Sequence, residues 1–217
     1  MKILKEVSLA DSLSVLNALL GFSAITNVIL YGLSNTSFAL FYFSLIVDGL
    51  DGLVASKTER SPIGKELDSL ADSISFGVFP ALTLIKYNPN LFPFAALLVA
   101  STILRLARFN ILSFENFIGV PTTVNALLVT SLIRLNFETN LIALATFISS
   151  ILMISDFEYP KIKNKPFLLV SAIVLVFAIH FVFLCYLIVI ASVAYMILPR
   201  EVTCRWKRRE ERLLKLE

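Results

Sequence analysis

The chain has 217 residues, of which 57% are hydrophobic and only 16% are charged, and its mean hydropathy is +0.82. A soluble globular domain carries about 25% charged residues, so this composition argues against a water-soluble globule. The formal charge of +3 is matched by the last 18 residues, where seven Lys and Arg outnumber four Asp and Glu. The body is therefore neutral and has no basic surface for nucleic acid.

Eight apolar segments follow one another along the chain. A membrane-spanning helix needs about 20 apolar residues, and shorter ones are tolerated inside a bundle. No Asp, Glu, Lys or Arg occurs in three long stretches, 12–47, 139–155 and 166–199. Breakers such as Ser61-Pro62 and Pro89-Asn90 separate most of the segments. The predicted helices cover residues 12–32, 37–55, 66–86, 91–110, 120–135, 139–155, 167–181 and 184–199.

We expect an all-α, polytopic integral membrane helix bundle of about eight transmembrane helices, with six as the alternative. The last pair is the difficult part, because 167–198 contains no turn residue. Three lysines between residues 161 and 165 precede this block, and the basic tail follows it, so the positive-inside rule places both in the cytoplasm. An even number of crossings must join them, which predicts two short helices. Lys86 and Arg134 then fall outside, as exceptions to the rule.

Four aspartates stand at the junction of the second and third segments. Asp48 and Asp51 end the second segment, and Asp68 and Asp72 begin the third, so each pair lies on one face of its helix. An ionised Asp in the bilayer core costs at least about 2.5–3.5 kcal/mol, and four together repel one another. Cations must therefore sit among them. Hard oxygen ligands suit Mg²⁺, Mn²⁺ or Ca²⁺, and two such ions balance four carboxylates.

These residues belong to a longer pattern. The stretch Asp48–Ala55 (DGLDGLVA) followed by Gly64–Asp72 (GKELDSLAD) resembles the signature of the CDP-alcohol phosphotransferases. Members of that family are integral membrane enzymes that move a phosphatidyl-type group from a CDP-linked lipid to an alcohol, releasing CMP. Two departures stand out. Ser56 and Lys57 stand where the family has Arg directly after the Ala, and the gap to Gly64 is one residue shorter than usual.

The resemblance extends to the phosphatidylserine synthase branch of the family, over about residues 8 to 200. It is carried by the continuation to Pro80 (SISFGVFP), by Leu104–Asn110 (LRLARFN) and by Phe117–Pro121 (FIGVP). It implies a CDP-lipid and L-serine as substrates, a homodimer, and a multi-pass cell-membrane protein whose active site faces the cytoplasm. Residues 1–199 would form the transmembrane domain, and 200–217 a basic cytoplasmic tail.

The resemblance also implies roles for individual residues. Asp48, Asp51 and Asp68 would bind a divalent cation, and Asp72 would share a second cation and act as the general base. The two ions would be Mg²⁺ or Mn²⁺. The implied nucleotide-binding residues are Asn17, Gly52, Ala55, Ser14 and Lys57.

Two arginines are candidates for the acceptor site. Arg105 and Arg108 lie one turn apart near the cytoplasmic end of the fourth segment. A guanidinium group can bind the carboxylate of serine through two parallel hydrogen bonds. The alternative is that both arginines bind lipid phosphate, or extend to the headgroups and only mark topology.

Two alternative functions stay open at this point. The same chemistry could use inositol phosphate or glycerol phosphate as acceptor, and paired intramembrane aspartates also occur in divalent-cation transporters. The lipid tail is open as well, because diacylglycerol and archaeol carry similar headgroups. The leading hypothesis is a CDP-diacylglycerol or CDP-archaeol–serine O-phosphatidyltransferase.

Overall fold

The computed structural model describes residues 8–55, 61–111, 117–159, 165–197 and 201–202, and most of them are helical. A π-helical segment (Ser73–Val78) joins α3 to α4, and a single 3₁₀ turn (Pro89–Leu91) precedes α5. The helices are α1 (Leu9–Tyr31), α2 (Asn35–Ala55), α3 (Gly64–Asp72), α4 (Phe79–Tyr87), α5 (Phe92–Ile111), α6 (Thr122–Arg134), α7 (Thr139–Ile154), α8 (Lys165–His180) and α9 (Leu184–Ile197).

Each of the eight predicted segments overlaps one helix or one continuous helical run. Four of these are long and apolar enough to cross a membrane, and three shorter apolar helices follow in α7, α8 and α9. The long ones are Leu9–Tyr31, Asn35–Val54, Gly64–Tyr87 and Pro89–Ile111. The fold agrees with an all-α membrane bundle, while the number of crossings stays a prediction.

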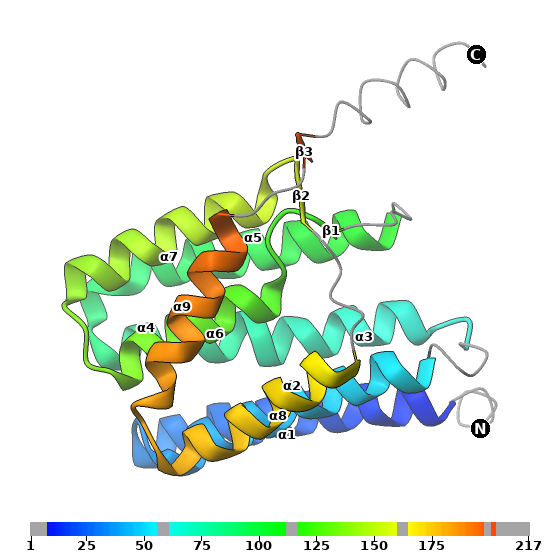
Figure 1. Cartoon of the computed structure of the whole chain (residues 1–217), viewed down its shortest axis with the longest axis horizontal. Helices are drawn as coiled ribbons and strands as arrows, with labels where there is room; N and C mark the ends of the chain where they lie inside the picture. The colour runs from blue at the N-terminus through cyan, green and yellow to red at the C-terminus, as the bar shows by residue number, and fades with distance from the viewer. Residues whose placement is uncertain (1–7, 56–60, 112–116, 160–164, 198–200, 203–217) are drawn as a thin grey trace.

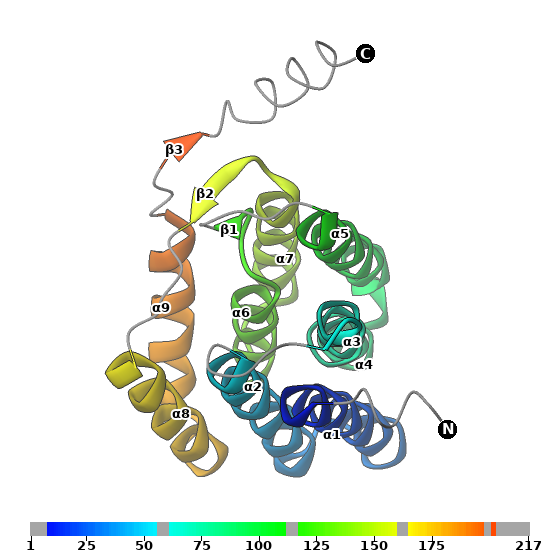
Figure 2. The same ribbon diagram turned by 90° about the vertical axis from the view of Figure 1, so that its right-hand side faces the viewer.

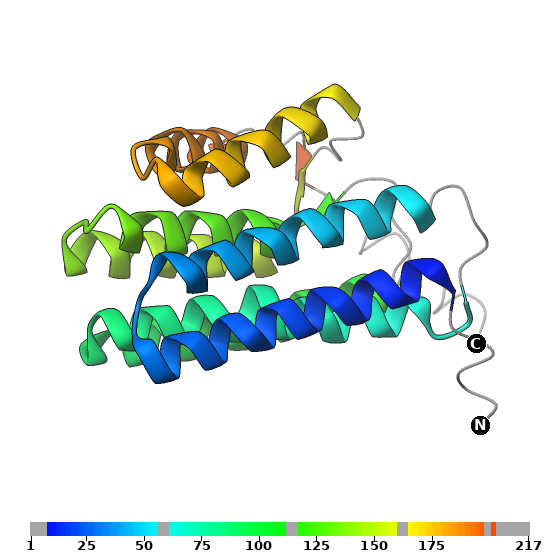
Figure 3. The ribbon, with the colours of Figure 1, turned by 90° about the horizontal axis from the view of Figure 1, so that it is seen from below.

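Most helices lie side by side along the long axis of the molecule, whereas α9 crosses it at a steep angle (Figure 1). Figures 2 and 3 show three layers, with α8 and α9 in one outer layer, α2, α6 and α7 in the middle, and α1, α3–α4 and α5 in the other outer layer. Aromatic side chains fill the interior between layers. Phe41 stacks on Phe79 at 4.8 Å and meets the edge of Phe76 at 6.3 Å, and all three are fully buried.

A small antiparallel sheet closes one end of the bundle. Its strands are β1 (Phe117–Ile118), β2 (Phe157–Tyr159) and β3 (Glu201–Val202), in the order β1-β2-β3. The sequence analysis did not predict this sheet. Strand β2 precedes α8 and strand β3 follows α9, and the two strands pair with each other. The start of α8 and the end of α9 therefore lie at the same end of the bundle. The predicted pair of short helices is thereby confirmed, with the break at residues 181–183.

Arg134, an exception to the positive-inside rule, is buried at the opposite end of the bundle. Its guanidinium donates to the backbone oxygens of Ala178 and Ile179 at 2.8 and 3.2 Å, and to Tyr42 Oη and Asn35 Oδ1 at 3.3 and 3.1 Å. The two backbone oxygens are the last carbonyls of α8, which carry the negative end of the helix dipole. The positive charge is therefore stabilised locally, and Arg134 joins the ends of α2, α6 and α8.

Helix α1 and the π-helical segment approach each other closely at Gly21. A Cβ atom on Gly21 would lie 2.9 Å from Ser75 Cα, closer than real Cβ contacts come. Ser75 Oγ donates to the backbone oxygen of Asn17 at 3.0 Å, one turn away on α1. Gly21 therefore sets the distance between α1 and the helix that follows Asp72.

We expect Gly21→Ala to lower the free energy of unfolding by about 1–3 kcal/mol, because α1 must move away from Ser75. Thermal unfolding in detergent would measure the change. Gly49→Ala is the matched control, since a Cβ atom there meets nothing within 4 Å. An equal melting temperature for the two variants would contradict the close approach.

Candidate active site

Three of the four predicted aspartates converge between the last turns of α2 and α3. Asp48 of α2 and Asp68 and Asp72 of α3 each offer a carboxylate oxygen, and these oxygens lie within 4.8 Å of one another. All three residues are half-buried. Oxygens at this separation can share a cation whose ligand distances are about 2.0–2.6 Å. The donor set of hard oxygens and its concentrated negative charge both fit a divalent metal ion.

Asp51 lies outside this group of three, one turn beyond Asp48 on α2. It is only 4% exposed, and it accepts a hydrogen bond from Ser14 Oγ of α1. It remains close enough to Asp48 for their charges to interact. The structure thus places the fourth aspartate beside the group, against α1.

Helix α1 supplies hydrogen-bond donors to the carboxylates. Asn17 Nδ2 donates to Asp72 Oδ1 at 3.3 Å, and Ser14 bonds Asp51 from the preceding turn of the same face. Both side chains are buried. Two of the five residues that the family resemblance assigned to the nucleotide therefore contact two of the acids. These bonds fix the orientation of both carboxylates.

The other residues assigned to the nucleotide lie at the end of α2. Gly52 is exposed, and a Cβ atom built on it meets none of the described residues within 4 Å, so they leave the space beside this turn open. Ala55 is the last residue of α2, and Lys57 lies outside the described residues.

Arg105 of α5 lies beside the acids. It is 6% exposed, and its charge interacts with Asp72 of α3 and with Tyr195 of α9. The structure therefore brings one predicted arginine to the carboxylates. It also adds Tyr195, which the sequence analysis missed because this residue lies in an uncharged apolar stretch with no motif around it.

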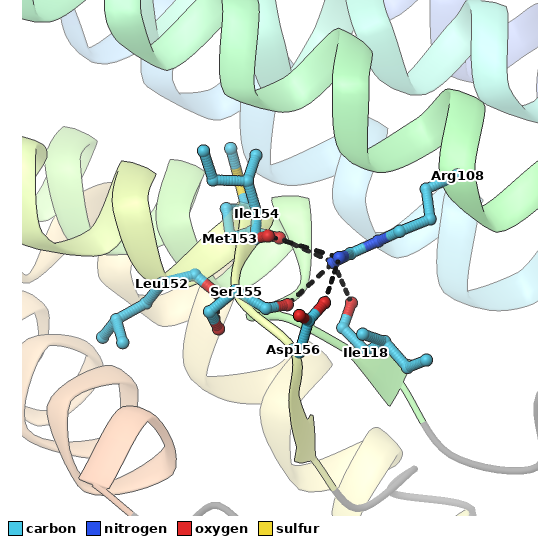
Figure 4. Close-up of polar contacts among 7 residues, drawn as sticks. All are labelled: Arg108, Ile118, Leu152, Met153, Ile154, Ser155 and Asp156. Carbon is cyan, nitrogen blue, oxygen red and sulfur yellow. Dashed lines mark hydrogen bonds and ion pairs between the residues drawn. The ribbon is translucent and has the colours of Figure 1, made fainter. Parts of the chain in front are cut away.

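Arg108 points to different partners (Figure 4). Its guanidinium contacts the C-terminal end of α7, the two residues that follow this helix, and β1. The acceptors are the backbone oxygens of Met153, Ile154, Ser155 and Ile118, at 3.4, 3.2, 3.0 and 3.1 Å, and Asp156 Oδ1 at 3.2 Å. Arg108 therefore acts as a helix cap that joins α5, α7 and the sheet. These contacts do not support the predicted role of Arg108 at the acceptor site, which stays a prediction.

Two hydrogen bonds hold α3 against α5. Ser69 Oγ donates to Asn110 Oδ1 at 2.9 Å, and Lys65 Nζ donates to the backbone oxygen of the same asparagine at 2.7 Å. Because Ser69 lies between Asp68 and Asp72, and Asn110 lies five residues after Arg105, these bonds fix the acids relative to the arginine.

Comparison with known proteins identifies relatives over most of the chain. The family model described as CDP-alcohol phosphatidyltransferase matches residues 7–198. A protein of Methanocaldococcus jannaschii named CDP-diacylglycerol–serine O-phosphatidyltransferase is 40% identical over 178 residues, 81% of this chain and 85% of its own. The archaetidylserine synthase of Methanothermobacter thermautotrophicus is 38% identical over 173 residues, 75% and 74% of the two chains. A CDP-diacylglycerol–serine O-phosphatidyltransferase of Bacillus subtilis is 33% identical over 159 residues, 68% and 87%.

We expect Arg108→Lys to lower the free energy of unfolding by about 2–3 kcal/mol, because an ammonium group cannot reach five acceptors spread around a planar guanidinium. The melting temperature in detergent would show the loss. Lys86→Ala removes an exposed cation at the other end of the bundle and should change stability by less than about 0.5 kcal/mol. A stable Arg108→Lys variant would contradict the capping role.

Proposed function

The chain belongs to the CDP-alcohol phosphatidyltransferase family, and we propose that it transfers a phosphatidyl or archaetidyl group from a CDP-lipid to the hydroxyl of L-serine, releasing CMP. The observation that carries this proposal is the group of Asp48, Asp68 and Asp72 with Arg105 beside it. Because the chain belongs to this family, we no longer consider the alternative function of a divalent-cation transporter. The chain would be a CDP-lipid–serine O-phosphatidyltransferase of phospholipid biosynthesis.

We propose that Asp48, Asp51, Asp68 and Asp72 hold two divalent cations, Mg²⁺ or Mn²⁺. When bound, such ions neutralise the diphosphate of the CDP-lipid and stabilise the charge that develops on the leaving CMP. The hydrogen bond from Ser14 fixes the orientation of the Asp51 carboxylate beside the other three, and such supporting contacts maintain ligand orientation.

Asp72 is the proposed general base. Asn17 Nδ2 holds Oδ1 of this carboxylate, which fixes the direction of the other oxygen. Asp72 takes the proton of the serine hydroxyl while the serine oxygen forms a bond to the β-phosphorus of the CDP-lipid, the phosphorus that carries the lipid. The bond between this phosphorus and the bridging oxygen of CMP breaks, and CMP leaves with that oxygen.

For the nucleotide we propose Asn17, Ser14, Gly52, Ala55 and Lys57. The support comes from two of them. Oδ1 of Asn17 is buried and accepts no hydrogen bond from the described residues, so it is placed to accept one from a ligand. Gly52 adjoins open space at the end of α2, where a phosphate-bearing ligand can approach the backbone.

Of the two predicted arginines, we propose Arg105 for the acceptor. Its charge interacts with Asp72, and serine must place its hydroxyl at Asp72 to react. Binding of the serine carboxylate by Arg105 would put that hydroxyl within reach of the base. Arg108 instead binds the end of α7.

The membrane placement is also a proposal. We infer a multi-pass cell-membrane protein with eight crossings and the acids on the cytoplasmic side, supported by the lysines at residues 57, 65 and 161–165 and by the basic tail. The homodimer implied by the family resemblance stays a prediction. The names of the relatives cover both diacylglycerol and archaetidyl lipids, so both kinds of donor belong in an assay.

We expect the purified protein to release CMP from CDP-diacylglycerol or CDP-archaeol only when L-serine and Mg²⁺ or Mn²⁺ are present. Asp72→Asn should reduce the rate at least about a hundredfold, because the general base and a metal ligand are both lost. Glu138→Gln, an exposed acid at the far end of the bundle, is the control and should keep the wild-type rate. Release with inositol phosphate or glycerol phosphate in place of serine would overturn the acceptor.

We expect Arg105→Lys to raise KM for serine about tenfold to a hundredfold, the effect of losing a charge-assisted hydrogen bond of about 1.5–3 kcal/mol. KM for the CDP-lipid should stay close to the wild-type value. Arg108→Lys, assayed at a temperature at which it is folded, should leave KM for serine unchanged. If Arg108→Lys raised KM for serine and Arg105→Lys did not, the acceptor role would belong to Arg108.

A further inference from the structure

An open slot lies between α7 and α9. Both helices pack against α6, with α7 beside it in the middle layer and α9 over it in the outer layer (Figure 2). The space that they leave has a volume of about 350 Å³. Leu128 and Leu132 of α6 form its floor, and side chains of α7 and α9 form its two walls.

The walls of the slot are apolar along their whole length. On α7 they include Leu141, Ala145 and Ile148, and on α9 Val189 and Val193. The polar exception is Ser149, which is fully buried. Its hydroxyl donates to Asn125 Oδ1 at 2.7 Å, so it offers no donor to a ligand. The slot therefore suits hydrocarbon and no polar group.

The dimensions of the slot indicate which shape of hydrocarbon group fits into it. Its α7 wall rises from Leu141 to Leu152, a distance of about 17 Å at about 1.5 Å per residue. A volume of about 350 Å³ spread over this length leaves a slot too narrow for a helix about 10 Å across. A single extended hydrocarbon chain fits. The length is also close to half of the roughly 30 Å hydrocarbon core of a bilayer.

One end of the slot adjoins the candidate active site. Leu152, at this end, precedes Met153, whose backbone oxygen accepts a hydrogen bond from Arg108. Met196, on the opposite wall, follows Tyr195, which interacts with Arg105. A lipid whose headgroup reaches the acids can therefore extend a chain into the slot from this end.

We propose that the slot between α7 and α9 binds one hydrocarbon chain of the CDP-lipid substrate. The proposal rests on the proposed function, since it assigns the lipid of that reaction to a place in the fold. A chain held in the slot would fix the lipid end of the substrate, so that the diphosphate meets the acids in one orientation.

Filling the middle of the slot tests the proposal. Ala145 lies about 10 Å from Leu152 along α7, so a six-carbon chain entering at Leu152 ends before it and a sixteen-carbon chain passes it. We expect Ala145→Trp to raise KM for a long-chain CDP-lipid about tenfold, the effect of removing about two methylene groups from contact. KM for the dihexanoyl analogue and for serine should not change. Val189→Trp, on the opposite wall, should act in the same way.

Matched controls place the same bulk on the adjacent outer face. Leu144→Trp on α7 and Ile190→Trp on α9 add tryptophan at exposed positions that do not line the slot, and both should keep the wild-type KM. Unchanged KM for the long-chain lipid in both slot variants, with the melting temperature retained, would overturn the proposal. So would an equal rise for short and long chains, which would indicate distortion of the active site.

Two further outcomes have distinct meanings. Loss of co-purifying bilayer phospholipid in Ala145→Trp, with KM unchanged, would assign the slot to ordinary membrane lipid and overturn our proposal. If the wild-type protein releases no CMP from any CDP-lipid, the proposed function fails. The slot is then tested by native mass spectrometry with Mg²⁺, where binding of long-chain CDP-lipid should still be weaker in Ala145→Trp than in Leu144→Trp.

Discussion

Carboxylates that converge between apolar helices repel one another strongly, because little water is present to screen them. In this fold Asp48, Asp68 and Asp72 nevertheless meet within 4.8 Å. The neighbouring helices supply what this requires. Helix α1 donates hydrogen bonds through Ser14 and Asn17, and α5 brings the positive charge of Arg105. The packing of α1, α2, α3 and α5 is thus arranged around a charge that only cations can balance fully.

The three arginines of the described helices show how a bundle of this kind accommodates positive charge. Arg105 lies beside the acids, whereas Arg108 and Arg134 bind the carboxyl ends of α7 and α8. A helix end carries a partial negative charge, so a guanidinium there is compensated without a second full charge. Arg108 adds an ion pair with the exposed Asp156. The two capping arginines hold the bundle together at its opposite ends.

The predictable part of this structure follows from rules that act along the chain. In a bilayer the backbone must satisfy its hydrogen bonds within each segment, so uncharged stretches identify the helices directly. The spacing of the four aspartates placed them on facing helices, and charge on both sides of 166–199 predicted the break between α8 and α9. Strands of two or three residues leave no periodic pattern, so the sheet could not be foreseen. Nor could the different partners of Arg105 and Arg108, which lie one turn apart but contact elements distant in sequence.

The acids come from the second and third helices of the chain, whereas Tyr195 and one wall of the slot come from α9, and β3 completes the sheet only after α9. A chain that enters the membrane in order of synthesis therefore gathers its carboxylates early and completes the surroundings of Arg105 last. During biogenesis, a chain whose last helix is not yet in place would have the carboxylates together but would lack α9, which supplies Tyr195. Completion of the surroundings of Arg105 is in this way tied to the packing of the last two helices, α8 and α9.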